Sequence, residues 1–270
     1  MSAISKAFQQ AVQAGARGVI PYITAGFPDL ATTEQVIVAL GEAGATAIEV
    51  GVPFSDPMAD GPVIQRACEH ALAQHVTLGA ILKTIAAARQ RTKVPIVLFS
   101  YLNPLLQFGL ERLASEGATA GVSGVLVTDL PADVGSQFAA QLRREDIDFI
   151  TLVTPTTTDQ RLRQILAPAS GFLYAVSRTG VTGTQNQISG DAKDLVTRVR
   201  ALSDLPVALG FGISNVDHAR KAWAYCDAVV IGSALVKLIG NSPKGSEAAN
   251  AKQFIQQFTS VQVATAASEK

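Results

Sequence analysis

The sequence predicts a single α/β domain of the (β/α)8 TIM-barrel class, with one extra helix at the N-terminus. Short apolar runs alternate eight times with segments of helical spacing, and such alternation indicates a parallel sheet. The runs are continuously apolar, which is typical of strands that are buried on both faces. A closed barrel takes roughly 250 residues, so one domain is expected over residues 1–270.

An open, doubly wound sheet is the alternative fold. Polar candidate residues stand at the C-terminal ends of many strands, whereas an open sheet gathers them near one switch point. The glycine fingerprint of dinucleotide-binding proteins is also missing after the first strand. Both observations favour the closed barrel.

Strands are expected wherever a short, continuously apolar run is bounded by turn residues. The first run is Val-Ile-Pro-Tyr-Ile-Thr-Ala-Gly, and the third is Pro-Ile-Val-Leu-Phe-Ser-Tyr. In chain order the expected strands are 19–26, 46–51, 95–101, 123–129, 148–153, 171–176, 206–210 and 227–232.

Helices are expected where apolar residues recur on one face. In the first, at 2–14, Ile4, Phe8 and Val12 share a face, and Pro62 suits the first turn of a later one. The helices that follow are expected at 33–43, 63–73, 78–89, 106–116, 133–144, 159–166, 191–202 and 215–224, with a short one opening at 234 and a last one within 248–258. Residues 262–270 are expected to be a frayed tail.

The composition argues against several classes of function. Charged residues make up 16% of the chain and the formal net charge is zero, so the charge favours neither nucleic acid nor an anionic membrane. No apolar stretch reaches the ~18 residues of a membrane span, and the N-terminus lacks the apolar core of a signal peptide. Cys68 and Cys226 show no metal or redox spacing, so we expect buried thiols in the cytoplasm, or in a plastid if the source is photosynthetic and eukaryotic.

The chain is organised around residues 47–62. This stretch begins as an apolar strand that contains one carboxylate, Glu49, and continues as a loop that carries Asp56 and Asp60. A strand that delivers an acid into a loop before a helix is how a TIM barrel builds its active site. A lone Glu in a buried strand is costly without a purpose. For Asp56, which precedes a proline, an ordinary turn-capping role remains open.

A phosphate site is expected late in the chain. Three glycine-bearing segments, at 180–183, 209–213 and 231–234, fall late in the chain, and the last two stand where predicted strands seven and eight end. Glycines let backbone N–H groups approach an anion, and the loops after strands seven and eight are the usual phosphate site of this barrel. Ordinary turn glycines are the alternative. The expected phosphate-binding residues are Gly183, Gly210, Gly212, Gly232 and Ser233.

The residues that are absent from key positions narrow the chemistry. No lysine falls on a predicted strand, which disfavours a Schiff-base aldolase. The histidines His70, His75 and His218 lie in predicted helices or at their ends and form no metal-binding set, so no metal is expected. Carboxylates, a tyrosine and a phosphate site remain. They suit cofactor-free proton transfer on a phosphorylated small molecule.

The segment Glu49-Val-Gly-Val-Pro-Phe-Ser-Asp-Pro-Met-Ala-Asp60-Gly-Pro closely resembles the signature of the tryptophan synthase α-subunit family, and the resemblance extends over residues 18–239. It implies a lyase that splits indole-3-glycerol phosphate into indole and D-glyceraldehyde 3-phosphate by retro-aldol cleavage. By this resemblance, Glu49 moves protons at indole C3 and the glycerol hydroxyl. Asp60 stabilises positive charge at the indole nitrogen, and Tyr174 lies near Glu49.

The resemblance also implies a binding pocket and a lid. The lid is the loop 178–188, whose Thr182 bonds the catalytic aspartate on closure. Its length and its glycine and threonine content fit a mobile segment. For each pocket residue, core packing is the alternative. The indole pocket is expected to comprise Tyr22, Ile64, Phe99, Tyr101, Leu126 and Thr128, with tyrosine at 22 where phenylalanine is common in the family.

A partner is the last expectation from the resemblance. The family docks on a β subunit that carries pyridoxal phosphate, in an α2β2 heterotetramer, while the α chain itself holds no cofactor. The docking surface would include the loop after the second strand and the segments 103–104 and 129–131. A free-standing lyase and a non-catalytic barrel that only regulates a partner remain open alternatives.

Overall fold

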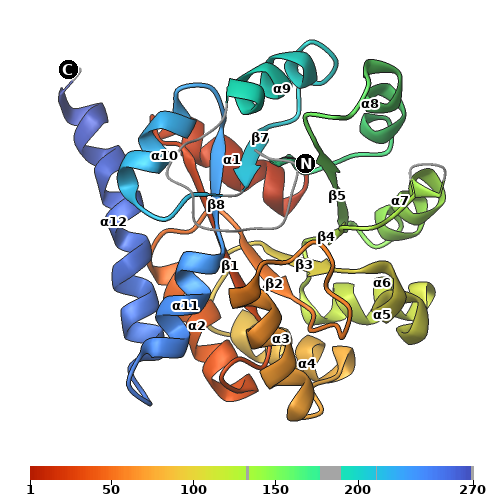
Figure 1. Ribbon diagram of the computed structural model, residues 1–270, viewed down its shortest axis with the longest axis vertical. Coiled ribbons are helices and arrows are strands. Elements are labelled where there is room, and N and C mark those ends of the chain that lie inside the picture. Colours follow the sequence, from red (N-terminus) through yellow and green to blue (C-terminus); the bar gives the residue numbers. More distant parts are fainter. Residues whose placement is uncertain (132–133, 177–189, 211, 269–270) are drawn as a thin grey trace.

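The computed structural model describes residues 1–131, 134–176, 190–210 and 212–268, with the backbone alone for 262–268. Eight parallel strands close into a barrel in the order β1 to β8, each paired with its neighbours in sequence. Helices surround the barrel on the outside (Figure 1). The predicted TIM-barrel fold is therefore confirmed.

The strands lie where the apolar runs predicted them, with shorter bounds. The fifth has the bounds expected from the sequence. The first begins one residue earlier and ends two residues earlier than expected, and the other six lose one or two residues at one or both ends. The strands are β1 Gly18–Thr24, β2 Ile48–Gly51, β3 Ile96–Ser100, β4 Gly124–Val127, β5 Asp148–Val153, β6 Leu173–Val176, β7 Val207–Gly210 and β8 Ala228–Ile231.

The helices also follow the predicted order, and the extra N-terminal helix is present. They are α1 Ala3–Gln13, α2 Leu30–Glu42, α3 Pro62–Ala73, α4 Leu78–Arg89, α5 Leu102–Phe108, α6 Leu110–Ala120, α7 Gly135–Arg143, α8 Asp159–Leu166, α9 Gly190–Arg200, α10 Val216–Trp223, α11 Ser233–Asn241 and α12 Glu247–Ser268. No single described helix is long and apolar enough to span a membrane; only the pair α3 and α4, bent by 101°, passes by length and composition.

The single helix predicted at 106–116 was wrong. Two helices, α5 and α6, occupy this region and meet at Gly109, whose φ of 93° ends one helix before the next begins. The backbone N–H of Leu102 in the first turn of α5 donates to Asp129 Oδ1 at 2.7 Å. This cap comes from 27 positions away in the chain, so no local pattern announces α5. The last helix also continues beyond its expected end, to Ser268.

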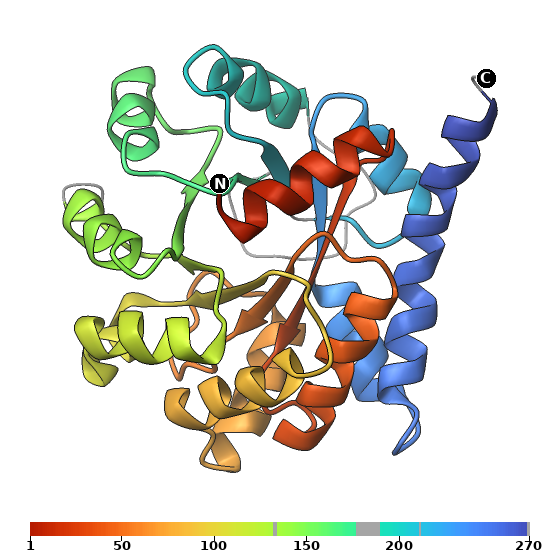
Figure 2. The same cartoon turned by 180° about the vertical axis from the view of Figure 1, so that it is seen from behind.

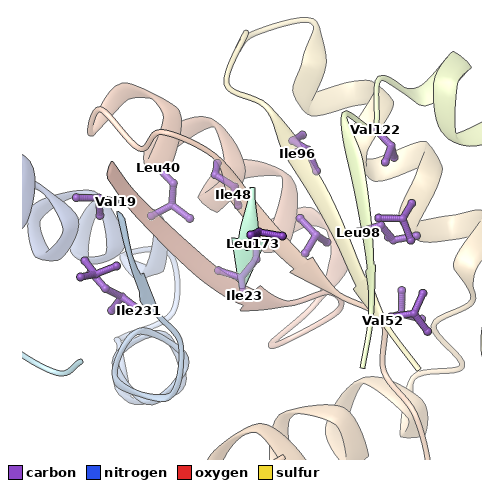
Figure 3. Close-up of a cluster of buried hydrophobic side chains, with 14 of the residues drawn as sticks. Val19, Ile23, Leu40, Ile48, Val52, Ile96, Leu98, Val122, Leu173 and Ile231 are labelled. Atoms are coloured by element: carbon purple, nitrogen blue, oxygen red, sulfur yellow. The ribbon is translucent and has the colours of Figure 1, made fainter. Parts of the chain in front are cut away.

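The core has two layers. An outer cluster joins the strands to the helices and includes Val19, Ile48, Leu98 and Leu40 of α2 (Figure 3). An inner cluster fills the barrel. Successive side chains of a strand point to opposite faces, so neighbouring residues belong to different layers. A polar residue that points inward is therefore surrounded by apolar side chains of the inner cluster.

The N-terminal helix α1 closes one end of the barrel. Phe8 on α1 packs on Phe172 with ring centroids 5.6 Å apart, and Ile4 belongs to the same inner cluster. Figure 2 shows α1 lying across this end. These contacts are made at the N-terminal ends of the strands, so the C-terminal ends remain for a site.

Candidate active site

Glu49 lies inside the barrel on β2. Its neighbours Ile48 and Val50 belong to the outer cluster, so its side chain points inward, and the strand register sets it between Tyr22 of β1 and Val97 of β3. The residue is fully buried and neither carboxyl oxygen has a hydrogen-bond partner in the described structure. Burial raises its pKa to about 8. At neutral pH this carboxyl therefore holds its proton.

Asp60 lies in the loop between β2 and α3, immediately before the first turn of α3. The hydroxyl of Tyr101 donates to Asp60 Oδ2 at 3.1 Å, and the backbone N–H of Ala59 donates to that same hydroxyl at 2.9 Å. Burial raises the pKa of Asp60 to about 6, while the hydrogen bond from Tyr101 acts in the lowering direction. Asp60 is therefore mostly ionised at neutral pH.

Two inward-facing tyrosines share this end of the barrel with the carboxyl groups. Burial is the main cause that raises the pKa of Tyr174, and the negative charges of Glu49 and Asp60 add to it. Burial is likewise the main cause for Tyr22, with Cys68, Asp60 and Glu49 contributing. The two carboxyl groups thus lie close enough to both tyrosines to influence their pKa values, although the four residues come from distant positions in the chain.

Glycines at the ends of two strands make room for these tyrosines. A Cβ on Gly51 would lie 2.1 Å from the hydroxyl oxygen of Tyr22, and a Cβ on Gly210 would lie 2.1 Å from that of Tyr174. Either side chain would exclude the tyrosine from its place. Gly210, predicted as a phosphate ligand, thus has a packing role beside Tyr174.

The predicted indole pocket is largely assembled by the barrel interior. Phe99 packs edge-on against Tyr22, with centroids 5.3 Å apart, and against Tyr174 at 6.4 Å. Ile64 and Leu126 belong to the same inner cluster. The structure therefore brings together an aromatic and aliphatic wall beside the two carboxyl groups.

The other two predicted pocket residues have different surroundings. Tyr101 packs on Phe54, with centroids 5.2 Å apart, and holds Asp60, so it positions a carboxylate. The sequence predicted Tyr101 as part of the indole pocket and did not predict its hydrogen bond to Asp60. Thr128 follows β4, where its hydroxyl donates to the Ser100 carbonyl at 3.4 Å.

The predicted phosphate residues flank two strand ends. Gly212 follows β7 with a φ of 82°, and apart from its chain neighbours no atom of the described residues lies within 4 Å of the position of a Cβ there. His218 of α10, which the sequence left without a role, has its Nδ1 2.8 Å from the Gly212 carbonyl oxygen.

Gly232 stands at the N-cap of α11 and provides no side-chain cap to Ser233 and the residues after it. Thr182 and Gly183 lie outside the described residues.

The described residues offer few groups for chemistry that depends on a metal ion or on a lysine in a strand. Within the described ranges no cluster of His, Cys, Asp or Glu side chains could hold a metal ion. None of the eight strands that the structure describes contains a lysine. Cys68 and Cys226 are both buried free thiols, as predicted.

A closed parallel barrel with two buried carboxyl groups of different acidity at one end is characteristic of TIM-barrel enzymes that act by acid–base proton transfer. The family model described as Tryptophan synthase alpha chain matches residues 8–266. The chain belongs to this family of carbon–carbon lyases, which cleave indole-3-glycerol phosphate to indole and glyceraldehyde 3-phosphate in tryptophan biosynthesis.

Individual relatives agree over most of the chain. The tryptophan synthase alpha chain of Geobacter sulfurreducens is 46% identical over 88% of this chain and 90% of its own length. That of Polynucleobacter asymbioticus is 42% identical over 96% and 98%. A chain of Mycobacterium tuberculosis tryptophan synthase superposes with a TM-score of 0.88 at 34% identity, covering 96% of this chain and 97% of that one. A chain of the Pyrococcus furiosus tryptophan synthase α2β2 complex superposes with a TM-score of 0.82 at 39% identity, over 89% and 97%.

Proposed function

We propose that Glu49 and Asp60 divide the acid–base work of the cleavage between them. The observation that carries this assignment is the difference in their surroundings: Glu49 is fully buried without a hydrogen-bond partner among the described residues, whereas Asp60 accepts a hydrogen bond from Tyr101. Glu49, with a pKa of about 8, holds a proton that it can donate, whereas Asp60, with a pKa of about 6, is negatively charged. Two titratable groups whose pKa values are driven apart are the usual sign of separate acid and base roles.

The steps follow from this division. Glu49 donates its proton to C3 of the indole ring, which generates an indolenine cation. Asp60 stabilises the positive charge at the ring nitrogen. The Glu49 carboxylate then accepts the proton of the glycerol hydroxyl. The C–C bond breaks, its electron pair returns to the ring, and indole and the aldehyde are released with Glu49 protonated again.

The phosphate group and the indole ring of the substrate bind to different residues at the C-terminal end of the barrel. We assign the phosphate group to the backbone at Gly212 and to the start of α11 at Gly232 and Ser233, where an uncapped helix N-terminus favours an anion. The indole ring lies against Phe99 and its aromatic neighbours. Tyr174 orients the ring and Glu49. The role of Thr182 as a lid residue remains a prediction from the sequence.

A β subunit is the proposed partner, and pyridoxal phosphate is its cofactor. On this chain the β2–α3 loop presents Met58, with 86% of its surface exposed, and α5 presents Leu106, with 53% exposed. Exposed large apolar side chains around a site opening favour a protein contact. The α2β2 complex of the Pyrococcus furiosus relative supports the same assembly. We place the complex in the cytoplasm.

The deciding experiment is indole release from indole-3-glycerol phosphate by the purified chain, with and without a β subunit. The proposal expects release in both cases and faster release with the partner. Release at the same rate with and without the β subunit would indicate a free-standing lyase. No release in either case would leave the regulatory barrel as the better description.

A further inference from the structure

A cavity lies at the outer face of the barrel, beside β4 and β5. It has a volume of about 80 Å³ and is bounded by the outer face of β4 and β5 and by the helices α7 and α8. Its wall includes Val127, Phe149, Ile165 and Pro168. Figure 1 shows α7 and α8 on the same side of the barrel as β5. Val127 and Phe149 of the wall belong to the outer cluster, so this part of the cavity lies on the side of the strands opposite to the Glu49 carboxyl. The wall also includes Ile150 and Leu152 of β5 and Thr128 after β4.

Thr151 places an unsatisfied hydroxyl in this cavity. Its neighbours Ile150 and Leu152 pack with the inner cluster, so Thr151 points outward, toward α7 and α8. The residue is 6% exposed, lines the cavity, and its Oγ1 has no hydrogen-bond partner among the residues that the structure describes. A buried hydroxyl without a partner is destabilising. The Thr151 hydroxyl is therefore a candidate for contact with a polar group bound in the cavity.

Two groups that favour an anion line the same cavity: the start of α7 and the side chain of Arg161. Helix α7 begins at Gly135 in the cavity wall, and its N-cap residue, Val134, supplies no side-chain hydrogen bond. Arg161 of α8 also lines the cavity, and the structure shows no ion pair of its guanidinium with a described residue. The nearest acid on that helix, Asp159, is paired with Arg198 at 2.7 Å. No acidic side chain is among the described residues that line the cavity.

We propose that this cavity binds a short-chain aliphatic carboxylate. The carboxylate group lies between the Arg161 guanidinium, the first backbone N–H groups of α7 and the Thr151 hydroxyl, which donates to it. The alkyl chain packs on Val127, Ile165 and Pro168. Butyrate is the probe, because a small ligand suits a volume of about 80 Å³. The ligand would lie on the outer face of β4 and β5, whereas the Glu49 carboxyl lies inside the barrel; Thr128, a predicted residue of the indole pocket, also lines the cavity.

The test is a ¹H–¹⁵N NMR titration of the full chain with butyrate, using uncharged butyramide as the matched probe. We expect saturable shifts at Gly135, Thr151 and Ile165, with a dissociation constant on the order of 1 mM for so small a ligand. Butyramide should bind at least about tenfold more weakly, because it lacks the charge. Absence of saturable shifts at these amides, or equal affinity for the two probes, overturns the proposal.

Three variants test the assigned groups. Arg161→Met should weaken butyrate binding about tenfold, whereas Arg163→Met, which removes a charge from the same helix outside the cavity, should leave the affinity unchanged. Thr151→Val should raise the melting temperature of the free chain and weaken butyrate binding, since it removes the unsatisfied hydroxyl. Equal losses in the two arginine variants, or normal binding by Thr151→Val, would assign the shifts to another cause.

Discussion

The hydroxyl group of Tyr101 stands between the backbone of Ala59 and the carboxylate of Asp60. It accepts a hydrogen bond from the Ala59 N–H at 2.9 Å and donates one to Asp60 Oδ2 at 3.1 Å. A loop carboxylate is thereby tied to the end of β3. Because the bond is donated to the charged form of Asp60, it opposes the effect of burial on the pKa.

Removing this hydroxyl should make Asp60 less acidic. In Tyr101→Phe the pKa of Asp60 rises above its wild-type value of about 6, because only burial then acts on it. We expect the acidic limb of the pH profile of kcat/KM to move to higher pH, with activity at neutral pH reduced about 3- to 10-fold. Tyr225→Phe, at the opposite end of the barrel, is the control and should keep the wild-type limb. A superimposable profile for Tyr101→Phe would show that Tyr101 does not tune Asp60.

The wild-type profile should itself be bell-shaped. Activity requires Asp60 ionised and Glu49 protonated, so kcat/KM rises as pH passes about 6 and falls as pH passes about 8. Indole release measured across this range gives both limbs. A rate that keeps rising above pH 8 would contradict the assignment of Glu49 as the proton donor.

Glu49→Gln tests the donor directly. The amide preserves the shape of the side chain and cannot deliver the proton, so indole release should fall by at least about 100-fold. Circular dichroism should remain that of the wild type, because neither carboxyl oxygen of Glu49 makes a hydrogen bond in the described structure that the amide would break. Retention of more than a few per cent of the activity would remove Glu49 from the proton-transfer role.

Two substitutions of Gly232 distinguish the effect of added charge from the effect of added bulk at the proposed phosphate site. Gly232→Ala places a Cβ 3.8 Å from Tyr22, an ordinary contact, so glycerol 3-phosphate should bind within a few-fold of the wild-type affinity. Gly232→Asp adds a negative charge beside the phosphate and should weaken binding by at least about tenfold. Gly212→Asp should do the same, with added strain from its φ of 82°. Calorimetric titration is the measurement, and unchanged affinity in both aspartate variants would place the phosphate elsewhere.

Features that depend on neighbouring residues in the chain could be predicted from the sequence, whereas contacts between distant residues could not. The strands were predictable because each is a continuous apolar run between turn residues, and Glu49 was predictable because a carboxylate interrupts one of those runs. The bond between Tyr101 and Asp60 spans 41 positions, and the α5 cap spans 27. No periodicity encodes either of these contacts, since they depend on how the barrel brings distant strand ends together.

Glu49 should also limit the stability of the fold as pH rises. Its folded-state pKa of about 8 lies above the ordinary value of 4.5, because burial disfavours the charged form. The unfolded chain therefore releases this proton at a lower pH than the folded chain. The stability associated with the protonated carboxyl is fully present below pH 4.5 and is lost as pH rises through about 8. The loss amounts to about 1.4 kcal/mol for each pH unit between these values.

Glu49→Gln removes this titration, so the variant should be more stable than the wild type at the upper end of that range. The difference in free energy of unfolding should grow steadily from pH 4.5 to about 8 and then remain constant. Urea denaturation at several pH values measures it, with Glu42→Gln as the control, because Glu42 is paired with Lys252 at the surface. Since the pKa of Glu42 is lowered, its loss should cost stability, if anything, at neutral pH. A constant difference between Glu49→Gln and the wild type at every pH would mean that Glu49 is ionised in the folded protein.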